Sequence, residues 1–180
     1  MHRALLVTGT AAMTDPTAAD RSIPADHAHA LEQVLASVRA QSLAMPPVAA
    51  MGLEVAQFDG ARLHMRAPLA LNVNDKGSAF GGSLTSLMTF CGWGLATLQL
   101  ALAGLEADVF VADSQVRYLH PLYADLQGEA WLEDGQSWDL FASTLAQRGR
   151  ARVTLNARVT RPGGGDAATL AGRYVAIARG

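Results

Sequence analysis

The sequence contains little cysteine, and this scarcity excludes two kinds of architecture. Cys91 is the only cysteine among 180 residues. A single thiol cannot form an intrachain disulfide framework, and it cannot supply a cysteine-cluster zinc site. Because scarce cysteine fits a reducing compartment, we expect a cytoplasmic protein.

Charge is also scarce and nearly balanced. Charged residues make up 17% of the chain, and 14 basic against 16 acidic side chains leave a formal net charge of -2. No global positive field is available to collect a polyanion, so we expect no nucleic-acid partner. Apolar residues account for 50% of the chain. At ~150 residues per domain, the length predicts one folded domain with a short appendage.

The first 24 residues offer no convincing targeting segment. The apolar stretch 4–7 is followed at once by Thr8, Gly9 and Thr10, so it is shorter than the ~7 to 15 apolar residues of a signal peptide. Residues 14–24 are rich in Ala, Asp, Thr and Pro without a usable period. We therefore expect a flexible N-terminal arm over 1–24 and one folded domain over 25–180.

One long segment, 77–105, contains no ionisable charge and exceeds the ~20 apolar residues of a membrane span. It also contains seven Ser, Thr or Gln residues and several glycines, and its flanks lack a basic cluster or an aromatic belt. A helix that is apolar nearly all round is equally what the centre of a soluble domain requires. The pattern favours a buried central helix, and we expect no membrane partner.

The remaining pattern predicts mostly strands. Apolar positions recur at the helical period over 26–41, and Met45-Pro46-Pro47 should end that helix, with a short turn then leading to Gly52. Asp59-Gly60 predicts a hairpin. A short helix is expected between Trp138 and Gln147, ended by Gly149. Strands are expected over 53–58, 61–69, 109–120, 126–132, 151–159 and 173–178. This order describes an α+β fold in which an antiparallel sheet of five to six strands wraps around one long central helix.

A family resemblance starts at the turn before the central helix. The stretch Asn72-Val-Asn-Asp-Lys-Gly-Ser-Ala-Phe-Gly-Gly-Ser83, the later Tyr118-Leu-His-Pro121 and Arg148-Gly-Arg-Ala-Arg152 carry it. Together they resemble the hotdog-fold thioesterases, and more narrowly the thioesterase domain at the C-terminus of YiiD-type acetyltransferases. The resemblance covers roughly 26–178. It implies a hotdog fold, acyl-thioester hydrolysis and a ligand tunnel where two subunits meet.

The Gly81-Gly82 pair gives the resemblance a chemical meaning. Without side chains the backbone can approach a ligand closely, and a helix that starts there presents unpaired N–H groups and the positive end of its dipole. Such donors can stabilise an oxyanion. The glycine pair alone favours a merely tight helix start, whereas the whole turn with its downstream order favours the oxyanion role.

The sequence departs from better known hotdog enzymes at two points. Phe80 stands where many carry a histidine, and the central helix has no carboxylate. Asp113 is the best candidate for activating water because it interrupts an apolar run, although an aspartate that caps a turn is about equally expected. Further candidates from the turn and the third strand are Asn74 and Asp75, Ser83 and Ser86, and Ser114, with Phe80 and Tyr118 as substrate-binding residues.

Other chemistry finds little support. Ser83 lacks the flanking pattern of a nucleophile elbow and is better explained as an N-cap serine. Cys91 lies deep in the apolar helix, where an inert core thiol is usual. His64 and His120 have no Asp, Glu or Cys at ligand spacing. We expect neither a metal nor a cofactor.

Alternating arginines mark the polar faces of several strands, and two interpretations stay open. A solvated sheet face is the simpler one, and contact with coenzyme A phosphates is the other. The arginines concerned are Arg62, Arg66, Arg150, Arg152 and Arg158.

Three functions follow from the resemblance. The first is hydrolysis of an acyl thioester on coenzyme A or acyl carrier protein, in a tunnel beside the central helix. The second is a noncatalytic acyl-thioester-binding or assembly module that lacks the base. The third and weakest is a dehydratase, because dehydration would require a histidine and an acidic residue that face each other across the site. Open sheet edges also predict a homodimer or a dimer of dimers.

Overall fold

The computed structural model describes residues 25–179, and the expected N-terminal arm lies outside the described residues. Within this range there are four α-helices and one 3-10 helix: α1 (Ala25–Leu43), α2 (Pro46–Ala50), η1 (Leu69–Leu71), α3 (Gly81–Leu102) and α4 (Trp138–Arg148). The strands are β1 (Glu54–Phe58), β2 (Arg62–Ala67), β3 (Ala107–Tyr118), β4 (Leu126–Leu132), β5 (Arg150–Thr160) and β6 (Asp166–Ala178).

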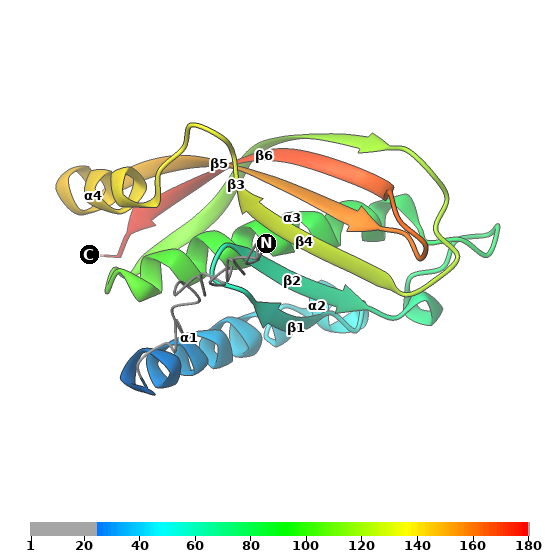
Figure 1. Cartoon of the computed structure of the whole chain (residues 1–180), viewed down its shortest axis with the longest axis horizontal. Coiled ribbons are helices and arrows are strands. Elements are labelled where there is room, and N and C mark those ends of the chain that lie inside the picture. Colours follow the sequence, from blue (N-terminus) through cyan, green and yellow to red (C-terminus); the bar gives the residue numbers. More distant parts are fainter. Residues whose placement is uncertain (1–24, 180) are drawn as a thin grey trace, which may run out of the picture.

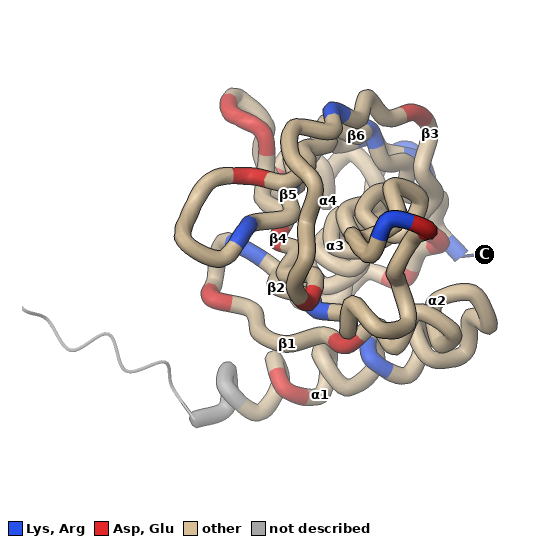
Figure 2. The backbone as a smooth tube through the Cα atoms, turned by 90° about the vertical axis from the view of Figure 1, so that its right-hand side faces the viewer, with Lys and Arg blue, Asp and Glu red and all other residues tan. Residues whose placement is uncertain are grey.

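The six strands form one sheet in the order β1-β2-β4-β5-β6-β3, and every neighbouring pair is antiparallel. The sheet curves around α3, while α1 and α2 lie on the side of β1 and β2 (Figure 1). Figure 2 looks along α3 and shows the strands arranged around it. The predicted α+β hotdog architecture, a sheet wrapped around one long helix, is confirmed.

Two local predictions were wrong. Residues 46–50 form the short helix α2 instead of a simple turn, with Pro46 in its first turn, where a missing N–H does no harm. β6 begins at Asp166 and not at Arg173. Its first half pairs with both β3 and β5, and this burial between two strands compensates for an Ala-rich sequence with weak strand propensity.

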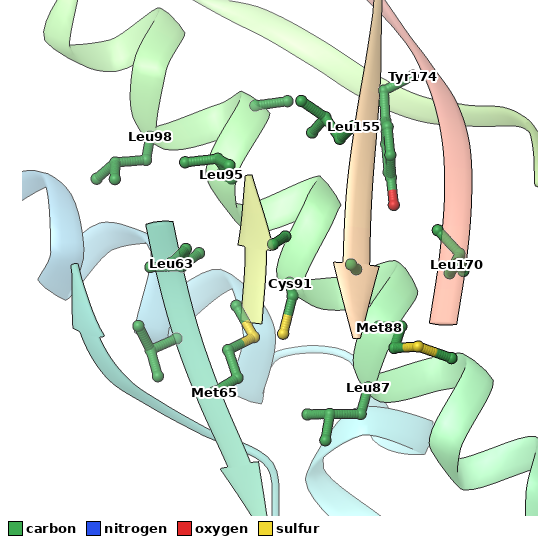
Figure 3. Packing of buried hydrophobic residues seen from close by; sticks show 14 of the residues in the cluster. Leu63, Met65, Leu87, Met88, Cys91, Leu95, Leu98, Leu155, Leu170 and Tyr174 are labelled. Atoms are coloured by element: carbon green, nitrogen blue, oxygen red, sulfur yellow. The ribbon is translucent and has the colours of Figure 1, made fainter. Parts of the chain in front are cut away.

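The core lies between α3 and the concave face of the sheet. Leu87, Met88, Cys91, Leu95 and Leu98 of α3 have no exposed surface, and Figure 3 shows them directed at side chains from β2, β5 and β6. α3 is long and apolar enough to pass a length-and-composition test for a membrane span, and 56% of the tested window is buried inside the protein. This burial is what a core helix has.

Small residues let α3 approach the sheet closely. The hydroxyl of Tyr174, a fully buried residue of β6, donates a hydrogen bond of 3.1 Å to the carbonyl oxygen of Thr89 in α3. A Cβ atom at Gly92 would lie 2.1 Å from that hydroxyl, and a Cβ at Gly128 would lie 2.9 Å from the Leu87 side chain. Glycine is therefore required at both contact points.

The two edges of the sheet differ. At the β1 edge, Arg39 of α1 reaches the strand, and its Nε donates to the carbonyl oxygen of Val55 at 3.5 Å. At the opposite edge, β3 pairs only with β6 among the described residues. All but three of the twelve β3 residues are exposed, so one long edge is free to pair.

Candidate functional site

The loop before α3 is held by backbone hydrogen bonds. Val73 and Ala79 form an isolated antiparallel bridge, and the N–H of Phe80 donates to the carbonyl oxygen of Asn72 at 2.7 Å. The N–H of Ala79 donates to the carbonyl oxygen of Leu122 at 2.7 Å, which ties this loop to the one after β3. The start of α3 therefore has a defined position beneath the end of β3.

The side chain of Asn74 already makes hydrogen bonds within this loop. Its Oδ1 accepts from the N–H groups of Lys76 and Ser78, and its Nδ2 donates to Ser78 Oγ at 3.0 Å. Asp75 is exposed beside it and forms an ion pair with Lys76 at 2.8 Å. A catalytic role for Asn74 stays a prediction, and it would require the side chain to give up hydrogen bonds that shape the turn.

The first turn of α3 presents free backbone donors. The first helical hydrogen bond runs from the N–H of Leu84 to the carbonyl oxygen of Phe80 at 3.1 Å, so the N–H groups of Gly81, Gly82 and Ser83 have no partner within the helix. Phe80 occupies the N-cap position and makes no side-chain capping bond. The interpretation of Ser83 as the N-cap was wrong, because the helix starts two residues before it. The uncapped dipole favours a negative group at this point.

Two aromatic rings flank the glycine pair. Phe80 is 56% exposed and Tyr118 is 59% exposed. A Cβ atom at Gly82 would lie 2.3 Å from Cε1 of Phe80, and one at Gly81 would lie 3.3 Å from Cε1 of Tyr118. Side chains at these positions would therefore crowd the rings, whereas glycine leaves the backbone donors accessible between them.

The Tyr118 hydroxyl joins β3 to the helix start. It lies 2.7 Å from Oγ1 of Thr85 and donates to the carbonyl oxygen of Gly81 at 3.2 Å. Tyr118 was predicted as a site residue from the sequence, whereas Thr85 was not. The helical period was the available signal, because residues four apart share one face and Thr85 therefore lies above Gly81.

Asp113 lies on the other face of the sheet. Its Cα pairs with that of Arg173, and the two side chains form an ion pair. Arg173 is exposed, whereas its neighbour Tyr174 points at α3, and successive strand residues face opposite sides. Within one chain Asp113 is thus not brought to the helix start, and its role in activating water stays a prediction. Ser114 follows it in the strand opposite Gly172.

The described residues give no support for a reactive thiol or for a metal site. Cys91 is fully buried, and this burial raises the pKa of its thiol, so it is a core residue as interpreted. Among residues 25–179 there is no group of three or more His, Cys, Asp or Glu side chains that could hold a metal ion. The expectation of no metal and no cofactor stays a prediction.

The antiparallel sheet around one helix, with its uncapped glycine start, defines a protein of the hotdog-fold thioesterase class. A family model described as "Putative thioesterase (yiiD_Cterm)" matches residues 36–178, which is most of the chain. The chain belongs to this family of YiiD C-terminal domains, as the resemblance implied.

Solved structures agree with this assignment. A protein of unknown function from Chlorobaculum tepidum is 25% identical, with 82% of this chain and 96% of that chain covered and a TM-score of 0.76. A "putative thioesterase" from Shewanella oneidensis is 29% identical, with 81% and 99% covered and a TM-score of 0.72. A thioesterase from Haemophilus influenzae, at 14% identity, 80% and 90% coverage and a TM-score of 0.60, shares the fold.

Proposed function

We propose that this protein hydrolyses an acyl thioester carried on coenzyme A or on acyl carrier protein. The single observation that carries the proposal is the uncapped start of α3. Among the described residues its first three N–H groups have no partner within the helix, and the Tyr118 hydroxyl contacts both Gly81 and Thr85 of the same turn. When water adds to the thioester carbonyl carbon, the carbonyl oxygen becomes negative, and the N–H groups of Gly81 and Gly82 are its expected donors. The C–S bond then breaks as the carbonyl re-forms, and the proton released by the attacking water passes to the sulfur, so the products are a carboxylic acid and a thiol.

The water must be positioned without a carboxylate from α3. We propose that the Tyr118 and Thr85 hydroxyls hold this water. Tyr118 donates its proton to the Gly81 carbonyl oxygen, so Thr85 donates to Tyr118, and both oxygens can still accept a hydrogen bond from the water. Phe80, Ser83, Asp75 and Ser114 stay predictions as substrate contacts.

A panel of acyl-coenzyme A and acyl carrier protein thioesters, with thiol release as the signal, tests the proposal. Gly82→Val should abolish turnover, because its side chain would displace the Phe80 ring and cover the donors. Tyr118→Phe should lower kcat by roughly ten- to a hundredfold. Tyr123→Phe is the matched control, since Tyr123 is an exposed tyrosine at 66% in the adjoining loop, and it should leave turnover unchanged.

A noncatalytic acyl-thioester-binding module is the second candidate. The observation that favours it is that α3 carries no carboxylate and that Asp113 is paired with Arg173 on the other face. It predicts saturable acyl-coenzyme A binding that Gly82→Val abolishes, together with no thiol release above the uncatalysed rate for any acyl length. Turnover that survives both Gly82→Val and Tyr118→Phe would contradict the site itself.

We further propose that the acyl pocket is completed by a second copy of the chain paired along β3. Five surface hollows of the described residues have volumes of about 200 to 370 Å³, and none of the five is lined by Gly81, Gly82 or Ser83. Near the free edge, Phe110 is 52% exposed and Leu119 is 42% exposed, and burying such groups stabilises an interface.

Light scattering tests this assembly. Phe110→Asp on the β3 edge should convert a dimer into a monomer with lower thioester affinity. Ile177→Asp is the matched control, because Ile177 is 41% exposed on β6, one strand in from the edge. A wild-type protein that is monomeric at micromolar concentration would exclude the shared pocket.

A further inference from the structure

A hollow lies on the convex face of the sheet, across β4, β5, β6 and β3. Its volume is about 310 Å³, which is at the lower end of the ~300 to 1,000 Å³ range of small-molecule pockets. Ala171, an exposed alanine of β6, contributes a short side chain to it. The surrounding side chains are larger and are mostly polar or aromatic: Gln115, Arg117, Trp131, Asn156, Arg158 and Thr169.

One side of the hollow is built as a rigid unit. The guanidinium carbons of Arg62 and Arg158 lie 4.9 Å and 5.6 Å from the Trp131 ring centroid. The same two arginines each donate to Oε1 of Glu129 at 2.6 Å, and the Glu129 side chain is only 11% exposed. Each guanidinium is held both by the Glu129 carboxylate and by the Trp131 ring. The two arginines therefore fix the orientation of the Trp131 ring before any ligand binds.

The other groups around the hollow have unused hydrogen-bonding capacity. Among residues 25–179, no partner is found for the side chains of Arg117, Gln115, Asn156 or Thr169. Asp166 also borders the hollow, but Arg158 lies 3.7 Å from its carboxylate and offsets its charge. Arg117 is therefore a cation whose five donors have no partner among the described residues, and it borders the same hollow as the Trp131 ring and two side-chain amides.

We propose that this hollow binds a planar heteroaromatic anion of the nucleoside monophosphate type. The ring stacks against the Arg158 guanidinium and the adjoining Trp131, since arginine planes stack on aromatic rings. The amides of Gln115 and Asn156 meet the polar ring edge. The phosphate pairs with Arg117, because an arginine fork matches phosphate oxygens in a bidentate arrangement.

This site is separate from the helix start. Arg117 pairs with Thr169, whereas the next residue, Tyr118, points at α3 and touches Gly81. Successive strand residues face opposite sides, so the hollow and the α3 start lie on opposite faces of one sheet. Binding here does not depend on the proposed hydrolase activity, and it can be measured without turnover.

Adenosine 5′-monophosphate is the probe, titrated up to 10 mM into the full-length protein at low salt. Binding is followed by calorimetry and by quenching of tryptophan fluorescence. We expect saturable binding with a Kd below about 1 mM and weakening of roughly tenfold or more in Arg117→Ala. Arg152→Ala is the matched control, because Arg152 is an exposed arginine on the same face of β5 with no ion pair among the described residues, and its Kd should be unchanged.

Two further ligands separate the parts of the proposal. Adenosine, which lacks the phosphate, and inorganic phosphate, which lacks the ring, should each bind at least tenfold more weakly than the nucleotide. Trp131→Phe should keep binding but lose most of the quenching. The proposal is overturned if no saturation appears at 10 mM, if Arg117→Ala binds like the wild type, or if inorganic phosphate competes as strongly as the nucleotide.

Discussion

Substitution of Gly92 by alanine should destabilise the protein strongly, although alanine is the better helix former. In an unhindered helix the change would stabilise by about 1 kcal/mol. Here the new Cβ would lie 2.1 Å from the Tyr174 hydroxyl and 2.5 Å from its Cζ. Tyr174 is fully buried and its hydroxyl donates to Thr89, so the ring has no solvent to move into.

The size of the effect follows from two contributions. Overpacking a filled core costs about 1 to 3 kcal/mol, and loss of the hydroxyl's partner adds about 1 to 3 kcal/mol because the group stays buried. After the gain in helix propensity, the expected net loss is about 3 kcal/mol. We expect this loss as a lower urea midpoint with an unchanged m-value.

Urea unfolding followed by circular dichroism, at one fixed protein concentration, measures this loss. Tyr174→Phe alone should cost only about 1 kcal/mol. The double variant Gly92→Ala/Tyr174→Phe should lose less stability than the two single variants lose together, because removing the hydroxyl removes the closest contact of the new Cβ. A Gly92→Ala protein as stable as the wild type, or more stable, would refute the packing argument.

Three other predictions concern titration, reactivity and charge. Hydrogen bonds from the N–H groups of Ala61 and Arg62 and from His64 lower the pKa of Asp59 to about 2, so its contribution to stability should be complete above pH ~4 and lost as the pH falls from 4 to 2. The urea midpoints of wild type and Asp59→Asn should therefore converge near pH 2, and a gap independent of pH would contradict this. Because burial raises the pKa of Cys91, a thiol reagent at pH 8 should label it only when urea is added, and fast labelling of the native protein would contradict its place in the core. Glu129→Ala leaves two arginines without their carboxylate and should lower the free energy of unfolding by about 2 kcal/mol, measured by thermal or urea unfolding. Glu54→Ala, which breaks an exposed ion pair, should lower it by less than ~1 kcal/mol. Equal losses in the two variants would show that burial of the carboxylate has no effect.

Periodic features of the sequence predicted most of the fold. Alternation of apolar and polar residues over 151–159 predicted β5, because a strand that is buried on one side leaves this pattern. The uncharged run 77–105 predicted α3, because a helix that is buried nearly all round leaves a continuous apolar run. Asp59-Gly60 and Gly149 marked a hairpin and a helix end through local backbone chemistry. The start of β6 was missed because its Ala-rich residues carry no strong strand signal.

For the candidate site, the sequence located the Gly81-Gly82 turn but did not indicate which side chains pack around it. It named the turn because two glycines before an apolar helix are a local signal. It did not find Thr85, and it ranked Asp113 as the first candidate for activating water. Both depend on which face of an element meets which neighbour, and that is decided by packing.

The sequence by itself therefore determined most of the element types, the family and the turn where backbone donors gather. Each of these depends on residues close together in the chain, where propensity, period and glycine content act directly. Only the tertiary structure decided the strand order, the pairing of Asp113 with Arg173 across the convex face, and the hydroxyl contact of Tyr118 with Thr85. These contacts join residues 33 to 60 positions apart, and the close packing of α3 into the curved sheet, which no local pattern records, brings such residues together.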